Sequence, residues 1–201
     1  MMRAIAGFLI CTLPAIAVAQ APANPPVRIR GAVEKLDGQN LTIKDRSGQS
    51  MSVKLADKFM VVGIFKGSVA DLGTGKFIGT TTVGERDGAL VAQEVHIFPE
   101  SMRGTGEGHY EWDLKPTSKM TTANVANVVS MANDRVMTVQ YKGGEKKIVV
   151  TKDTVVVTYV PVEKAELKPG ARVFVVAQKQ PDGSLTAARV NVGMNGQVPP
   201  M

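Results

Sequence analysis

Short stretches in which apolar and polar residues alternate, separated by glycine-bearing turns, make up most of the chain. Over residues 27–33 apolar side chains occupy every second position, which is the period of a strand with one buried face. Residues 41–44 and 51–55 repeat this pattern, and the glycines between the stretches suit tight hairpin turns. A nearly continuous apolar run over 59–65 fits a buried strand. The pattern therefore predicts an all-β chain of short strands.

The same order of elements occurs twice along the chain. Residues 87–95 and 182–190 both read Asp-Gly-x-Leu-x-Ala-x-x-Val, and each follows a segment rich in Val, Thr and Ile. Short strands joined by such turns favour a small closed or nearly closed barrel, because closure removes exposed strand edges. We therefore predict an internal duplication that forms two tandem β-barrels, over residues 27–99 and 124–193, joined by a Gly-rich segment.

The beginning of the chain has the pattern of a cleaved signal peptide. An early arginine precedes an apolar run over residues 4–18, and an Ala-Val-Ala triplet ends the run, as signal peptidase requires. We expect residues 1–19 to be removed, residues 20–26 to form a Pro-rich spacer, and the mature protein to be periplasmic or secreted. The alternative is an uncleaved N-terminal anchor. Cys11, the one cysteine of the chain, leaves with the signal, so the mature chain has no thiol chemistry.

The mature chain carries no later apolar run of membrane-spanning length, so we expect no transmembrane segment in it. The net charge of the chain is +6, which fits either an ordinary solvated surface or affinity for an anionic ligand. Positive side chains are spread over both repeats, among them Arg28, Arg30, Lys35, Lys44, Lys54, Lys146, Lys147 and Lys152. Aromatic residues are too scarce, at 5%, to offer clear stacking surfaces for bases, so we expect no nucleic-acid partner.

The segment between the two repeats, residues 100–123, breaks the strand pattern and holds the densest chemistry of the chain. Trp112, the one tryptophan, follows Tyr110 with charged residues on both sides. Such a pair suits a surface that closes on a ligand, and the alternative is that Trp112 fills the gap between two barrels. The residues that we expect to bind a ligand are Arg103, Glu107, His109, Tyr110 and Trp112.

Two other kinds of chemistry give alternative functions. His96 and His109, the two histidines, could ligate zinc or copper with nearby carboxylates, although their spacing matches no compact metal motif. No Ser-His-Asp or Cys-His arrangement is visible in the sequence, and we assign no catalytic residue. Glu107 and Glu111 form a carboxylate pair of the kind that acid–base catalysis uses, which leaves a glycan-acting enzyme as a third interpretation.

Several motifs resemble a bacterial family of exported domains of unknown function that looks OB-like. They are the strand pair formed by residues 31–33 and 41–43, the Leu-Lys-Pro-Gly at 167–170, and the two Asp-Gly-x-Leu-x-Ala-x-x-Val endings. The resemblance covers nearly the whole mature chain and departs from the family at residues 72–75, where the Lys-Pro is missing. It implies two tandem OB-like barrels, and it brings neither a known activity nor catalytic residues.

These observations predict an exported, non-enzymatic β-barrel module of the cell envelope that binds a ligand or a partner. The expected partner is an unidentified envelope protein or an anionic ligand, and residues 194–201 are expected to form a C-terminal tail. A periplasmic metal-binding protein that uses His96 and His109 is the first alternative, and zinc or copper enters only there. An envelope glycan-acting enzyme is the second.

Overall fold

The computed structural model describes residues 25–131 and 134–200, and nearly all of the regular structure there is β-strand. The all-β prediction is therefore confirmed, whereas the expected signal peptide (1–19) lies outside the described residues. The helical parts are single 3-10 turns, namely η1 (Val69–Asp71), η2 (Glu100–Met102) and η3 (Lys164–Glu166). None of the helices in the described part of the chain has the length and apolar character needed to cross a bilayer.

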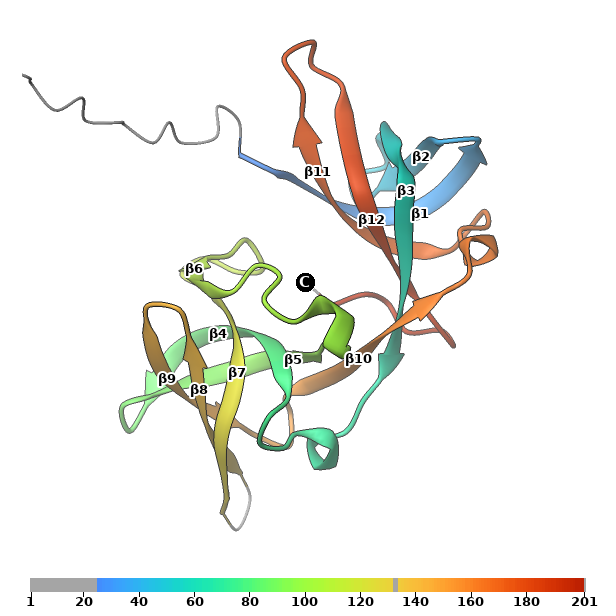
Figure 1. Ribbon diagram of the computed structural model, residues 1–201. Helices are drawn as coiled ribbons and strands as arrows, with labels where there is room; N and C mark the ends of the chain where they lie inside the picture. Colours follow the sequence, from blue (N-terminus) through green and yellow to red (C-terminus); the bar gives the residue numbers. More distant parts are fainter. Residues whose placement is uncertain (1–24, 132–133, 201) are drawn as a thin grey trace, which may run out of the picture.

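Five strands form a closed β-barrel (Figure 1). They are β1 (Val27–Asp37), β2 (Asn40–Asp45), β3 (Ser50–Lys66), β11 (Arg172–Lys179) and β12 (Leu185–Gly193). Their order is β12-β11-β1-β2-β3, and a parallel pairing of β3 with β12 closes the ring. Because β3 is seventeen residues long, it pairs with β2 near its start and still reaches beyond the barrel at its end.

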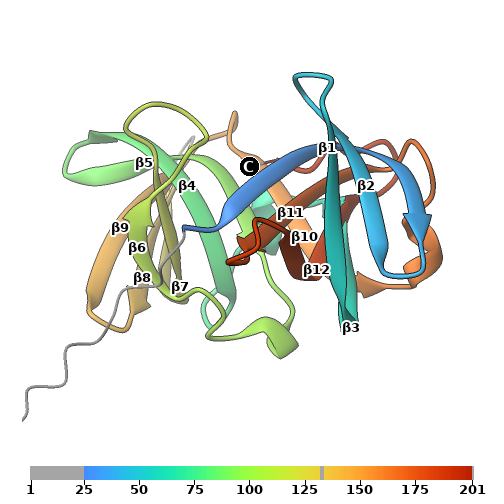
Figure 2. The same ribbon diagram turned by 90° about the horizontal axis from the view of Figure 1, so that it is seen from above.

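The other strands continue outward from the end of β3. They are β4 (Phe77–Arg86), β5 (Ala89–Ile97), β6 (Gly108–Glu111), β7 (Lys119–Ser130), β8 (Arg135–Tyr141), β9 (Gly144–Val150) and β10 (Val155–Val162). Strand β10 pairs with both β3 and β5, and the order then runs β5-β4-β7-β8-β9 with β6 on the edge of β7. A short parallel pairing also joins β5 to β9. Figure 2 shows β4 to β9 at the left of the view and the barrel strands β2 and β3 at the right.

The strand pairing does not confirm two tandem barrels. From the far end of the chain, β11 pairs with β1 and β12 pairs with β3, whereas β4 pairs with β7 and β5 pairs with β9. The last hairpin of the expected repeat 27–99, β4–β5, thus pairs with early strands of the expected repeat 124–193. The last hairpin of that second repeat, β11–β12, pairs with early strands of the first. A pattern of alternating side chains defines which face of a strand is buried, but it does not define the neighbouring strand, which is why the sequence did not predict this arrangement.

Buried side chains form three clusters, and the third positions the candidate site. One fills the closed barrel and includes Ile29, Leu41, Leu55, Val175 and Val190. A second lies among the outer strands and includes Ile78, Val95, Val125, Met137 and Ile148. The third, called here the central cluster, consists of Val62, Ile64, Met102, Met120, Val157, Tyr159 and Phe174. It joins β3, β10 and β11 to the segment after β5, so it links the closed barrel to the outer strands.

Candidate functional site

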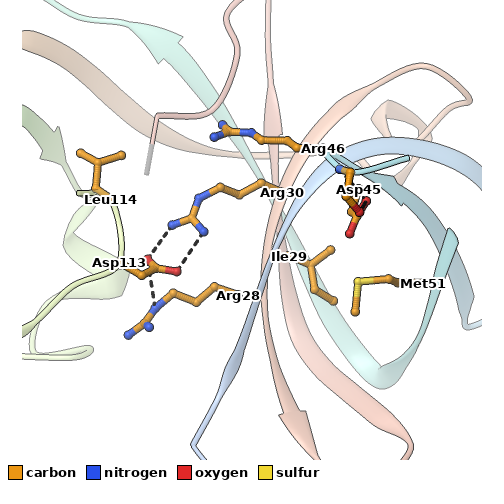
Figure 3. A pocket seen from close by; sticks show the side chains of 9 residues that line it. Arg28, Ile29, Arg30, Asp45, Arg46, Met51, Asp113 and Leu114 are labelled. Carbon is orange, nitrogen blue, oxygen red and sulfur yellow. Dashed lines mark hydrogen bonds and ion pairs between the residues drawn. The ribbon is translucent and has the colours of Figure 1, made fainter. Parts of the chain in front are cut away.

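Two arginines stand side by side on the outer face of the barrel. Along β1 the side chain of Ile29 is buried in the barrel core, and successive side chains of a strand point to opposite faces. Arg28 and Arg30 therefore share the other face, which the segment after β6 approaches. Together with Arg46 from the β2–β3 turn, they line a cleft of about 340 Å³, called here the arginine cleft (Figure 3).

The carboxylate of Asp113 reaches into the arginine cleft. Arg30 donates two parallel hydrogen bonds to it, at 2.8 Å from Nη2 to Oδ1 and 3.1 Å from Nη1 to Oδ2. Nε of Arg28 lies 3.9 Å from the same Oδ1, and Figure 3 shows both arginines pointing toward this residue. Burial raises the pKa of Asp113, but the hydrogen bonds and charge of Arg30 and the charge of Arg28 outweigh burial and lower it overall. Asp113 is therefore a fixed anion held by arginines.

Trp112 forms the junction between the cleft and the central cluster. The guanidinium carbon of Arg28 lies 4.1 Å from the centroid of its ring, which is a cation–π contact. Its indole is half-buried and packs against the central cluster. Trp112 thus packs where the closed barrel meets the outer strands, and it also contacts an arginine of the cleft.

Two buried donors in this region make no hydrogen bond with any described residue. They are Nε of Arg28 and Nε1 of Trp112. The 3.9 Å from Arg28 Nε to Asp113 is too long for a hydrogen bond. A buried donor without an acceptor costs about 1–3 kcal/mol, so an acceptor that entered from the cleft would stabilise this arrangement.

Two other residues that the sequence indicated for ligand binding lie on β6 rather than in the cleft. Nδ1 of His109 lies 2.8 Å from Oγ1 of Thr121, and its ring stacks on Tyr141 with 6.4 Å between the centroids. Burial, and then the positive charges of two nearby lysines, lower the pKa of His109. Tyr110 is exposed, and its ring meets that of Trp112 edge-on at 6.1 Å.

The side chains of Arg103 and Glu107 connect the central segment to the sheet through hydrogen bonds. The guanidinium of Arg103 donates to the carboxylate of Glu100, to Oδ1 of Asn124 and to the carbonyl oxygen of Gly75. The carboxylate of Glu107 accepts a hydrogen bond from the backbone N–H of Lys142 at 2.9 Å. Both side chains hold the fold together locally, and neither lines the arginine cleft.

The structure separates the two histidines that a metal site would need. His96 lies on β5 and His109 lies on β6, with strands β4 and β7 between them. Strand β5 pairs with β4, β4 pairs with β7, and β7 pairs with β6. Three strand spacings place them roughly 14 Å apart, too far to share one ion. His96 is fully buried with its Nε2 3.2 Å from Oε1 of Glu94. Among the described residues no group of three metal-ligating side chains occurs.

The carboxylate pair Glu107 and Glu111 is also divided between separate partners. Glu111 forms an ion pair with Lys119 on the neighbouring strand β7, and Glu107 bonds the backbone beyond β8. Both carboxylates are exposed and lie outside the residues that line the arginine cleft. The geometry therefore gives no support to a shared acid–base role for them.

None of the five expected ligand-binding residues lines the cleft, although Trp112 contacts its Arg28. The sequence interpretation did not include Asp113 or Arg46 among the ligand-binding residues. The alternation along β1 already placed Arg28 and Arg30 on one face of a strand, which was the available signal. No protein-family model, curated protein or solved structure matches this chain. The chemistry of the cleft is therefore the basis for a function.

Proposed function

We propose that this protein is an exported, non-enzymatic binding module of the cell envelope that takes up an anionic ligand in the arginine cleft. The observation that carries the proposal is the bidentate hydrogen bonding of Arg30 to the carboxylate of Asp113, with Arg28 beside it. Two parallel N–H···O bonds are the geometry by which arginine recognises carboxylates and phosphates. In this proposal Asp113 occupies the place that the acidic group of a ligand would take.

The charges that line the cleft support uptake of an anion. Three arginines and two aspartates line it, which leaves 3 − 2 = +1. One of the aspartates, Asp45, accepts hydrogen bonds from the side chain of Ser47 and the backbone of Gln49, and these bonds lower its pKa. Arg46 is exposed on the wall that Asp45 shares, so it is available to an incoming acid. Export rests on the signal-like pattern of residues 1–19.

The test is binding of inorganic phosphate and glucuronate to the chain from residue 20 onward, measured by titration calorimetry. Arg30→Gln and Arg46→Gln should each weaken binding by about tenfold or more, because each removes a charged hydrogen bond. Arg172→Gln is the matched control, since Arg172 is an exposed arginine of the same barrel outside the cleft. Equal binding by all three variants, or no binding of either anion to the unmodified protein, would contradict the proposal.

A finer proposal concerns the origin of the fold, which we infer to be a duplication with exchanged hairpins. Offsetting the chain by 95 residues superimposes the two Asp-Gly-x-Leu-x-Ala-x-x-Val motifs, which lie at the hairpins β4–β5 and β11–β12. In parallel pairings, β12 meets β3 at Ala187 and Leu55, and β5 meets β9 at Leu90 and Ile148. Each hairpin would then complete a five-stranded OB-like ring begun by the other copy.

A further inference from the structure

A second cavity, of about 490 Å³, lies between β12 and the turn η2. Its size falls in the range of small-molecule sites, roughly 300–1,000 Å³. Apolar side chains supply much of its wall, including Met60, Met102 and Val176. The lining shares no residue with that of the arginine cleft, so the two are separate places on the molecule. We call it the β12 cavity.

A partly buried arginine faces this cavity, and no carboxylate of the described residues forms an ion pair with it. Among the described residues the guanidinium of Arg189 makes one hydrogen bond, from Nη1 to the sulfur of Met102 at 3.8 Å. A thioether is a weak acceptor and carries no charge. The nearby ionisable group that acts on Arg189 is Tyr159, whose pKa burial raises strongly, so the phenol is neutral and leaves the cation unbalanced.

A buried acceptor without a donor lies two residues farther along the same strand. Asn191 is 2% exposed and lines the β12 cavity. Its Nδ2 donates to the carbonyl oxygen of Phe174 at 3.2 Å, whereas its Oδ1 accepts no hydrogen bond from the described residues. Residues i and i+2 of a strand share one face about 7 Å apart, so Arg189 and Asn191 present a cation and an acceptor to one small ligand.

We propose that the β12 cavity binds a small amphipathic organic anion that carries an N–H or O–H donor close to its acidic group. The acid would pair with Arg189, the donor would bond Oδ1 of Asn191, and the apolar part would lie against Met60 and Met102. A neighbouring apolar pocket of about 250 Å³ shares both methionines with the cavity. It extends the apolar wall and allows for a longer hydrocarbon part.

The probe for this site is anilinonaphthalene sulfonate, because the dye combines a sulfonate, an N–H donor and apolar rings whose fluorescence rises away from water. We expect saturable binding to the chain from residue 20 onward. Arg189→Gln and Asn191→Leu should each weaken it by about tenfold or more, whereas Arg172→Gln, at an exposed arginine that lines neither cavity, should leave it unchanged. Unchanged affinity in both cavity variants, or a rise in fluorescence that never saturates, would overturn the proposal.

Two further measurements separate a binding role from a structural one. Arg189→Met should abolish dye binding while the melting temperature stays equal or rises, because an apolar side chain of similar length replaces an unbalanced charge. A large fall in melting temperature would assign Arg189 to the fold instead. The N-methylated dye, which lacks the donor, should bind the unmodified protein more weakly but bind Asn191→Leu as well as the parent dye does. Equal binding of the two dyes by the unmodified protein would remove Asn191 from the site.

Discussion

Arg30 on the first strand and Asp113 in the segment after β6 are joined by two hydrogen bonds of 2.8 and 3.1 Å across 83 residues of sequence. The contact ties the closed barrel to the segment that carries Trp112. It also keeps an anion among the arginines of the cleft. The same contact therefore bears on both stability and ligand binding, and substitutions can separate the two.

Replacing Asp113 by asparagine should increase the affinity for phosphate roughly 3- to 10-fold. This corresponds to about 0.7–1.4 kcal/mol of binding free energy, because phosphate no longer has to displace a partly exposed ion pair from Arg30. The amide keeps the shape of the side chain but removes the charge that competes with the ligand for Arg30. Titration calorimetry of Asp113→Asn measures the change. Asp153→Asn, at an exposed carboxylate far along the chain, is the control. Weaker phosphate binding in Asp113→Asn would mean that Asp113 belongs to the binding apparatus rather than competing with the ligand.

The pKa of Asp113 lies below its ordinary value of 3.8, which has a consequence for stability in acid. A carboxyl group with a lowered folded-state pKa contributes stability that is present above the unfolded pKa and is lost as the pH falls through the folded pKa. The difference in melting temperature between the unmodified protein and Asp113→Asn should thus be constant at neutral pH and shrink below about pH 4. A difference that stays constant down to the lowest accessible pH would show that the ion pair contributes nothing.

His109 should make the protein less stable in mild acid. Burial and nearby lysines hold its pKa below the ordinary 6.5, so the unfolded chain binds a proton more readily than the folded chain. Stability contributed by the neutral ring is then present above about pH 6.5 and is lost as the pH falls toward the folded pKa. Melts between pH 5 and 8 should show a smaller decline for His109→Gln than for the unmodified protein. Parallel declines would refute this role.

Trp112 should affect stability as well as the cleft. Trp112→Ala should lower the free energy of unfolding by about 2 kcal/mol, less than the 3–5 kcal/mol typical of fully buried aromatics, because the indole is half-buried. Urea unfolding measures this, and Trp112→Phe, which keeps an aromatic face under Arg28, should recover most of the loss. If Trp112→Ala is as stable as the parent while phosphate binding is lost, the side chain serves the ligand alone.

A substitution at Gly31 tests how closely β1 approaches β2. A Cβ atom added there would lie 2.1 Å from the carbonyl oxygen of Lys44, which backbone movement alone can relieve. Gly31→Ala should therefore cost about 3 kcal/mol of unfolding free energy. Gly38→Ala, in the turn between the same strands, has open space around it and a φ of +58°, and should cost about 1 kcal/mol. Similar small losses for both variants in urea unfolding would mean that the two strands do not approach so closely.

The prediction of strands succeeded where the signal was local. The alternation over residues 27–33 corresponds to β1, with Ile29 and Val33 buried. The stretches 51–55 and 59–65 were expected as separate strands but form the single strand β3. Strand β6 was missed, because four residues are too few to show a period and the strand exists only through its pairing with β7.

The sequence by itself determined the all-β class, the positions of most strands, and the placement of Arg28 and Arg30 on one face of β1, because side-chain direction along a strand depends only on neighbouring residues. The tertiary structure alone decided which strands pair, and hence which side chains meet. In the folded chain Asp113 contacts Arg30, whereas His96 and His109 lie on strands that are not neighbours, and Arg189 contacts Met102. These relationships depend on contacts between distant segments, which local alternation does not specify.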